Sequence, residues 1–155
     1  MTLGIVNHLE LRVSNLDRAE AFYDPIMQFL GYCKHHRTRG SILYRRRRGI
    51  GDLILSRVPT AARGKTYDPE SPGFRHLAFR AGNRQEVDRL HRLLQKMKAT
   101  VLDAPSECSC SPGYYAVYFA DPDGMKLELA YTPFQNPSTR EELKRILANT
   151  KRKRN

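Results

Sequence analysis

Residues 8–15 read HLELRVSN, and residues 76–83 read HLAFRAGN. The histidine, leucine, arginine and asparagine recur at the same spacing in both stretches, and apolar residues alternate along each of them. Alternation with a period of two predicts a β-strand in each stretch. Because the pattern of the first half returns in the second, the chain is expected to repeat one structural unit.

The sequence that follows each stretch repeats as well. Apolar residues at helical spacing predict amphipathic helices over residues 17–30 and 84–97, begun by Ser14 or Asn15 and by Asn83. Pro25 falls inside the first helix and predicts a kink or a local irregularity. Three short strands are expected after each helix. They cover residues 32–37, 41–46 and 52–58 in the first half and residues 100–103, 114–120 and 125–131 in the second.

This order of elements predicts an α+β chain made of two βαβββ modules. The modules cover about residues 4–58 and 74–132, and a polar linker over residues 59–73 joins them. Together they form one domain of residues 1–135, whereas residues 136–155 are expected to hold a C-terminal helix and a basic tail.

The chain is strongly basic, with 27 Lys and Arg residues against 16 Asp and Glu residues and a formal net charge of +11. This balance favours anionic ligands without choosing among them. Part of the excess lies in two clusters, residues 45–48 and 151–154, and no nucleic-acid-binding motif accompanies them. Nucleic acid is therefore not expected to be the main partner. No apolar run suits a membrane span and no signal peptide is recognised, so a cytoplasmic protein without a membrane partner is expected.

The strand pattern places three potential metal ligands on the sheet faces that do not pack against the helices. Neighbouring residues of a strand point to opposite faces of a sheet. By this count His8, His76 and Glu128 lie on the faces turned away from the helices. Two histidines and one carboxylate, with coordination positions left open, are typical of Fe(II), Mn(II) and catalytic zinc sites. Arg12 and Arg80 recur on the same faces and are candidates for holding an anionic substrate or for pairing with nearby acids.

Several segments resemble the vicinal oxygen chelate superfamily, which includes glyoxalase I, extradiol dioxygenases, and the fosfomycin-resistance and bleomycin-resistance proteins. The matching segments are residues 7–13, 16–23, 30–31, 74–79 and 118–129. The last of these reads YFADPDGMKLEL, and its Phe-x-Asp-Pro-Asp-Gly-x-x-x-Glu pattern is the most specific part. The resemblance implies that the two modules form a cupped mixed β-sheet around a central cavity, with the helices outside. It also implies a homodimer.

The resemblance implies a ligand set too. Metal-binding members take ligands from the first, fourth, fifth and eighth strands, which here gives His8, His76 and Glu128. The fourth-strand position departs from glyoxalase I, because Ile54 stands where that enzyme has a carboxylate or amide. Ile54 is thus a candidate for contacting substrate rather than metal. The resemblance then favours a three-ligand site similar to that of extradiol dioxygenases, holding Fe, Mn, Zn or Ni.

Two functions follow from these observations. The first is a metal-dependent lyase or extradiol-type dioxygenase acting on a small, anionic substrate that chelates the metal through neighbouring oxygens. His36 and Tyr115, each beside a second histidine or tyrosine (His35 and Tyr114), are its acid–base candidates, and the alternative is that they are surface and packing residues. The second is a metal-free small-molecule binding or resistance protein of the bleomycin-resistance type, which the loss of the fourth ligand favours.

Overall fold

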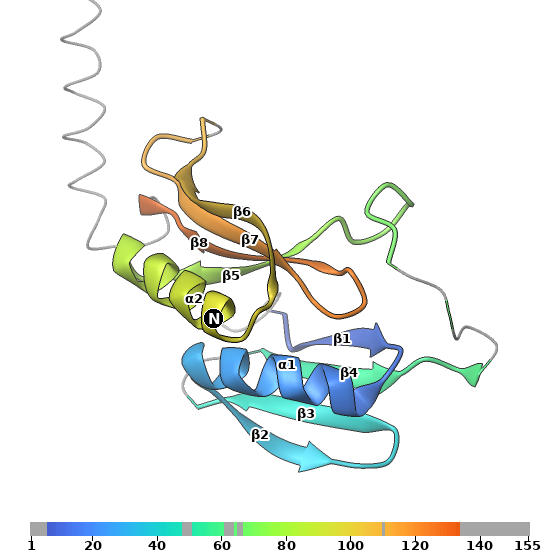
Figure 1. Cartoon of the computed structure of the whole chain (residues 1–155). Helices are drawn as coiled ribbons and strands as arrows, with labels where there is room; N and C mark the ends of the chain where they lie inside the picture. Colours follow the sequence, from blue (N-terminus) through green and yellow to red (C-terminus); the bar gives the residue numbers. More distant parts are fainter. Residues whose placement is uncertain (1–5, 48–50, 61–63, 65–66, 110, 134–155) are drawn as a thin grey trace, which may run out of the picture. The chain divides into compact units, whose positions relative to one another are not determined.

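The computed structural model describes residues 6–47, 51–60, 64, 67–109 and 111–133. It divides into two compact units (Figure 1). Unit 1 comprises Met1–Glu70 and Asp121–Met125, and unit 2 comprises Ser71–Ala120 and Lys126–Asn155. In its described residues each unit holds one helix and a four-stranded mixed sheet, so the predicted α+β fold of two βαβββ modules is confirmed. The predicted C-terminal helix and basic tail lie outside the described residues.

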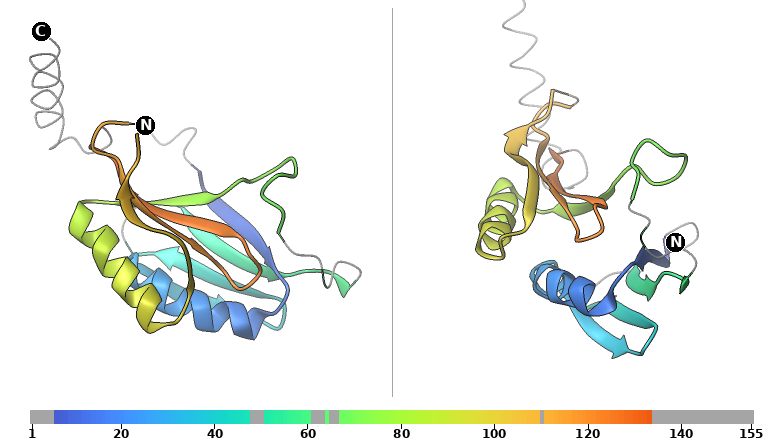
Figure 2. Two further views of the ribbon diagram at one scale, coloured as in Figure 1. Left: turned by 45° about the horizontal axis from the view of Figure 1, so that its top comes forward. Right: turned by 45° about the vertical axis from the view of Figure 1, so that its right-hand side comes forward.

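Unit 1 follows the predicted element order. The elements are β1 (His8–Val13), α1 (Leu16–Phe29), β2 (Tyr32–Arg37), β3 (Ser41–Arg46) and β4 (Asp52–Arg57). The strands lie in the order β1-β4-β3-β2, with β1 parallel to β4 and the other neighbours antiparallel. Helix α1 covers one face of this sheet (Figure 2).

Unit 2 repeats this arrangement. The elements are β5 (Leu77–Ala81), α2 (Arg84–Lys96), β6 (Thr100–Glu107), β7 (Tyr115–Ala120) and β8 (Lys126–Tyr131). The strands lie in the order β5-β8-β7-β6, and β5 is parallel to β8. The repeat extends to the strand register, because Glu10 lies opposite Ile54 on β4 and Ala78 lies opposite Glu128 on β8. Ile54 and Glu128 therefore occupy equivalent positions in the two units.

Helix α1 is stabilised by its N-cap residue and by the burial of its apolar face. The Asn15 side chain accepts hydrogen bonds from the backbone N–H groups of Asp17 and Arg18, which caps the helix. Pro25 removes one backbone donor, yet the helix continues to Phe29. The face that packs on the sheet is fully buried at Tyr23, Ile26 and Met27.

Helix α2 has a reciprocal cap. The Asn83 side chain accepts from the Glu86 N–H, and the Glu86 carboxylate accepts from the Gly82 N–H. The apolar residues at helical spacing, Val87, Leu90 and Leu94, are fully buried. The predicted cap at Asn83 is therefore confirmed, and of the two candidates for α1, Ser14 and Asn15, the structure has Asn15 as the cap.

Strand β6 is longer than the sequence predicted. It was expected to end at residue 103, but it continues through Pro105 to Glu107. Proline is tolerated because β6 is an edge strand, whose outer side has no ladder partner that needs a backbone N–H. The pairing with β7 shifts between Asp103 and Ser106, on either side of the proline. Among the described residues, no helix has the length and apolar character needed to cross a membrane.

A network of ion pairs joins α1 to β2. The Lys34 Nζ lies 2.5 Å from the Glu20 Oε1 and 2.7 Å from the Asp24 Oδ2, and the Arg37 Nε lies 3.0 Å from the Glu20 Oε2. Tyr44 Oη donates to the Asp24 Oδ1 at 2.6 Å. The hydrogen bonds from Lys34 and Arg37 lower the pKa of Glu20 below its ordinary value of 4.5.

Replacing Glu20 with glutamine is expected to lower the free energy of unfolding at neutral pH by about 0.5 kcal/mol, the usual scale for surface ion pairs. Because the folded-state pKa of Glu20 lies below 4.5, this stabilisation is present above pH 4.5 and is lost as the pH falls through the folded-state pKa. Thermal unfolding of both proteins at pH 7 and in acid measures the difference, with added salt as a control for screening. A difference of equal size in acid would contradict the ion-pair explanation.

Candidate metal centre

Glu128 is a carboxylate buried in the middle of a sheet. It lies on β8 between Leu127 and Leu129, which point to the helix side, so its own side chain points to the opposite face. The Glu128 residue is only 1% exposed. Removing a carboxylate from water is costly unless the charge is compensated, so its surroundings decide its role.

The two carboxylate oxygens of Glu128 are not equivalent. The hydroxyl of Tyr114 donates a hydrogen bond to Oε1. Oε2 lies 3.0 Å from the Nε2 of His76, but this contact lacks hydrogen-bond geometry, and Oε2 has no hydrogen-bond partner among the described residues. An unbonded carboxylate oxygen beside an imidazole nitrogen is a pair of donor atoms that suits a divalent cation.

Aromatic rings and one cation surround this pair. The rings of Tyr118 and His76 meet edge to face with their centroids 6.0 Å apart. The Lys126 Nζ lies 4.2 Å from the centroid of the Tyr118 ring. Burial and the Glu128 carboxylate both raise the pKa values of Tyr114 and Tyr118, so both phenols stay protonated at physiological pH.

His8, the third predicted ligand, lies in unit 1 at the start of β1 and is exposed. Its Nδ1 lies 2.9 Å from the Oδ1 of Asn7. This contact suits the tautomer with the proton on Nδ1, in which the lone pair of Nε2 can bind a metal. Ile54 in the same unit offers no donor atom.

The other sequence candidates are placed as follows. The Arg12 guanidinium donates to the backbone carbonyl of Arg57 at 3.1 Å, so it is held by the sheet of unit 1. Arg80 is exposed on β5, two residues beyond Ala78 and on the same face. His36 is exposed on β2.

The two neighbouring tyrosines before and at the start of β7 face different ways. Tyr115 donates to the Asp88 Oδ1 of α2 at 2.8 Å, and the Arg84 guanidinium lies over its ring. Tyr115 thus faces the helix, whereas Tyr114 reaches Glu128. Every second residue of a strand points to the same face, so Tyr114 could have been predicted from the sequence to share the face of Tyr118, which lies opposite Glu128.

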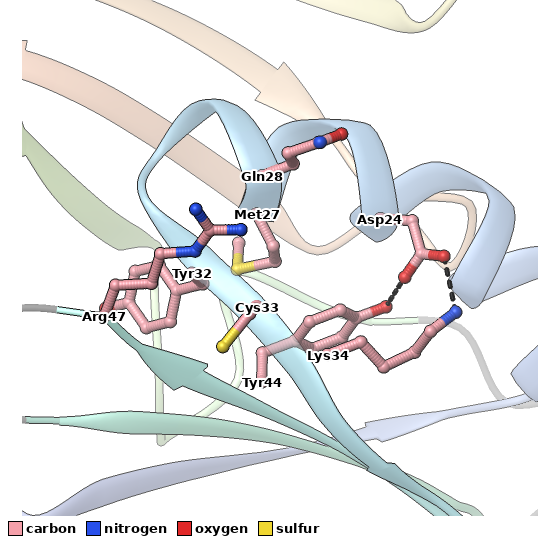
Figure 3. A pocket seen from close by; sticks show the side chains of 8 residues that line it. All are labelled: Asp24, Met27, Gln28, Tyr32, Cys33, Lys34, Tyr44 and Arg47. Atoms are coloured by element: carbon pink, nitrogen blue, oxygen red, sulfur yellow. Dashed lines mark hydrogen bonds and ion pairs between the residues drawn. The ribbon is translucent and has the colours of Figure 1, made fainter.

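A hollow lies within unit 1, between α1, β2 and β3 (Figure 3). It measures about 210 Å³, and Arg47 of the basic cluster 45–48 is among the residues that line it. Asp24 stands at its edge, bonded to Tyr44 and Lys34 as the dashed lines show. The carboxylate of Asp24 is thus already paired, so this hollow offers less to a divalent cation than Glu128 does.

Unit 2 thus brings together two of the three predicted ligands, His76 and Glu128. In the described part of either unit, no three His, Cys, Asp or Glu side chains form a complete metal site. Comparison with known proteins then decides the family. A family model described as the Glyoxalase/Bleomycin resistance protein/Dioxygenase superfamily matches residues 5–129. The chain belongs to this superfamily.

Individual members of the glyoxalase/bleomycin resistance/dioxygenase superfamily are similar over nearly their whole length. The uncharacterized protein YqjT of Bacillus subtilis (strain 168) is 27% identical over 125 residues, which are 80% of this chain and 96% of YqjT. The crystal structure of a glyoxalase candidate from Bacillus halodurans has a TM-score of 0.75 at 27% identity and covers 84% of this chain and 98% of its own. A lactoylglutathione lyase from Agrobacterium tumefaciens shares the fold at 22% identity, with a TM-score of 0.61 and coverage of 83% and 93%.

Proposed function

We propose that the protein is a divalent-metal-dependent enzyme of the lyase or dioxygenase type. Its substrate is a small molecule that chelates the ion through neighbouring oxygens. The observation that carries the proposal is the Glu128 Oε2, a buried carboxylate oxygen to which no described residue donates a hydrogen bond and which has an imidazole nitrogen 3.0 Å away. A fold without a ligand at this place would gain stability by replacing the carboxylate with an apolar residue.

The residues that would hold the ion are His8, His76 and Glu128. The two imidazoles and the carboxylate suit Fe, Mn, Zn or Ni, and the ion when bound supplies Lewis acidity toward an oxygen that becomes negatively charged. Tyr114 and Tyr118, both protonated, are the hydrogen-bond donors next to the carboxylate. Ile54 leaves the fourth ligand position of glyoxalase I without a protein donor, so substrate oxygens would take its place.

His8 would come from the same chain or from the second chain of a homodimer. Both arrangements supply one histidine from a copy of unit 1 and the His76–Glu128 pair from a copy of unit 2. We propose the homodimer because the superfamily often builds its sites between modules of two chains. The oligomeric state in solution, measured by light scattering, checks this part separately.

The charges near Glu128 support an anionic substrate. Lys126 lies two residues before Glu128 on the same strand face, and Arg80 lies on the same face of neighbouring β5. Among the described residues neither cation has an acidic partner within salt-bridge distance, so both are available to a carboxylate or phosphate group. In unit 1, Arg12 is less available to an anionic substrate, because its guanidinium already donates a hydrogen bond to the Arg57 carbonyl.

The test of the proposed function is the metal content of protein purified without an affinity tag. We expect about one divalent ion per chain, the stoichiometry of a mononuclear site, and a loss of at least 10-fold in affinity for His8→Ala and for His76→Ala. His91→Ala, which removes a histidine from α2, is the matched control and should keep the ion. Retention of the ion by both ligand variants would refute the site.

The alternative is a metal-free small-molecule binding protein of the bleomycin-resistance type. Ile54, in the position equivalent to Glu128, is the observation in its favour, because unit 1 has no carboxylate at this position of β4. The metal analysis separates the two functions. Protein that binds no divalent ion after incubation with Fe(II), Mn(II), Zn(II) or Ni(II) would favour the alternative.

A further inference from the structure

Of the two carboxylate oxygens of Glu128, Oε1 accepts a hydrogen bond from Tyr114 and Oε2 does not. We propose that Tyr114 is a positioning residue that engages Oε1 and thereby presents Oε2 alone to the ion. The inference rests on the proposed metal site and adds a residue outside its ligand set. The bond itself and the unbonded Oε2 are both features of the same buried carboxylate.

The backbone around Tyr114 is held firmly enough for this role. Its N–H donates to the Ser111 carbonyl at 3.1 Å, and its own carbonyl accepts from the Cys108 N–H at 3.1 Å. The next residue, Tyr115, is anchored to Asp88 on α2 at 2.8 Å. Tyr114 is therefore fixed through the chain on both sides, and its hydroxyl is directed at β8 rather than into solvent.

Engaging one oxygen changes what the carboxylate can do. The terminal torsion of a glutamate is broad, so an unrestrained carboxylate can rotate or bind an ion through both oxygens. With Oε1 bonded to Tyr114, the carboxylate occupies a single coordination position of the ion. A substrate that binds through two neighbouring oxygens needs two further positions, and Tyr114 keeps these open.

The position of Tyr118 supports the same reading. Tyr118 lies directly opposite Glu128 in the β7–β8 ladder, and the Lys126 cation lies 4.2 Å from the centroid of its ring. Within the described part of the chain Lys126 forms no ion pair with Glu128, which leaves the charge of Oε2 for an ion.

The test compares Tyr114→Phe with Tyr115→Phe, the same substitution at the next residue but on the helix side. Both are titrated with Co(II), whose absorption spectrum reports the number of ligands. We expect Tyr114→Phe to weaken Co(II) binding by about 10- to 100-fold, the usual effect of losing a partner of a metal ligand, and to change the spectrum. Tyr115→Phe should bind Co(II) like the wild type and give the same spectrum.

The outcomes separate this inference from the proposed function. If the wild type binds no Co(II), the metal site and the role of Tyr114 both fall. If the wild type binds Co(II) and Tyr114→Phe shows the same affinity and spectrum, only the role of Tyr114 falls. Tyr114→Met, which also lacks the hydroxyl but packs through a flexible side chain, replaces Tyr114→Phe if circular dichroism shows that the latter is unfolded.

Discussion

Replacing Glu128 with glutamine is expected to abolish metal binding while leaving the metal-free protein at least as stable as the wild type. The ligand variant loses the only negative charge of the proposed donor set, so the affinity for a divalent ion should fall by about 100-fold or more. Calorimetric titration with the ion found in the purified protein measures this loss.

The expected stability of the metal-free Glu128→Gln protein has a separate physical cause. Glu128 is 1% exposed, and its carboxylate accepts a hydrogen bond from the Tyr114 hydroxyl. Glutamine has nearly the same volume, its amide oxygen still accepts from Tyr114, and it carries no charge to desolvate. Its amide nitrogen would also lie where Oε2 now lies, 3.0 Å from the His76 Nε2.

Urea unfolding in the presence of a chelator measures this stability. Glu107→Gln, at an exposed carboxylate that pairs with Arg84, is the control for removing a charge from the same unit. A fall of more than about 2 kcal/mol for Glu128→Gln would mean that the carboxylate stabilises the fold instead, as a buried ion pair does when one partner is removed.

Replacing Asp121 with alanine is expected to lower the free energy of unfolding by about 3 kcal/mol, because it leaves several buried donors without an acceptor. The Asp121 Oδ1 accepts from the N–H groups of Asp123 and Met125, each at 2.8 Å. The Oδ2 accepts from the Tyr23 hydroxyl at 2.9 Å, and Tyr23 is fully buried in unit 1.

Asp121→Asn is the matched control, since it keeps the size of the side chain and one oxygen for the backbone donors. Tyr23→Phe removes the other partner, and a double-mutant cycle of Tyr23→Phe with Asp121→Ala isolates the energy of their bond. Additive effects of the two substitutions on the free energy of unfolding would mean that the hydrogen bond between Tyr23 and Asp121 contributes nothing to the stability lost in Asp121→Ala.

The pH dependence of Asp121 runs opposite to that of Glu20. Burial raises the pKa of Asp121 above its ordinary value of 3.8, although three hydrogen bonds oppose this. The folded protein therefore holds this proton more tightly than the unfolded chain, and the stability that the proton contributes is lost as the pH rises through the folded-state pKa. Relative to Asp121→Asn, the wild type should gain stability on acidification toward pH 3.8.

Much of the fold could be predicted from the sequence because both periodicities are strong and recur. The alternation through Leu9, Leu11 and Val13 and the helical spacing of Val87, Leu90 and Leu94 leave little choice of element. The exception at Pro105 has a physical reason: proline removes a single N–H, and on the edge strand β6 the side away from β7 has no ladder partner that needs it.

The candidate site was less accessible to sequence reasoning. The face of Glu128 follows from alternation, but its near-complete burial depends on side chains from other strands that the pattern does not locate. The choice between Tyr114 and Tyr115 required the start of β7, and strand ends are where pattern reasoning is weakest. The meeting of His8 with the other two predicted ligands stays a prediction.

The turn of residues 121–125 also bears on how this chain can evolve. Although β7 and β8 flank it, the turn packs in unit 1, where Asp123 accepts from the Ser14 hydroxyl and the Arg18 guanidinium and Asp121 accepts from Tyr23. A gene fragment encoding only the first repeat would lack these acceptors. Unit 1 is therefore not encoded by one continuous stretch, because five of its residues lie within the sequence of the second repeat.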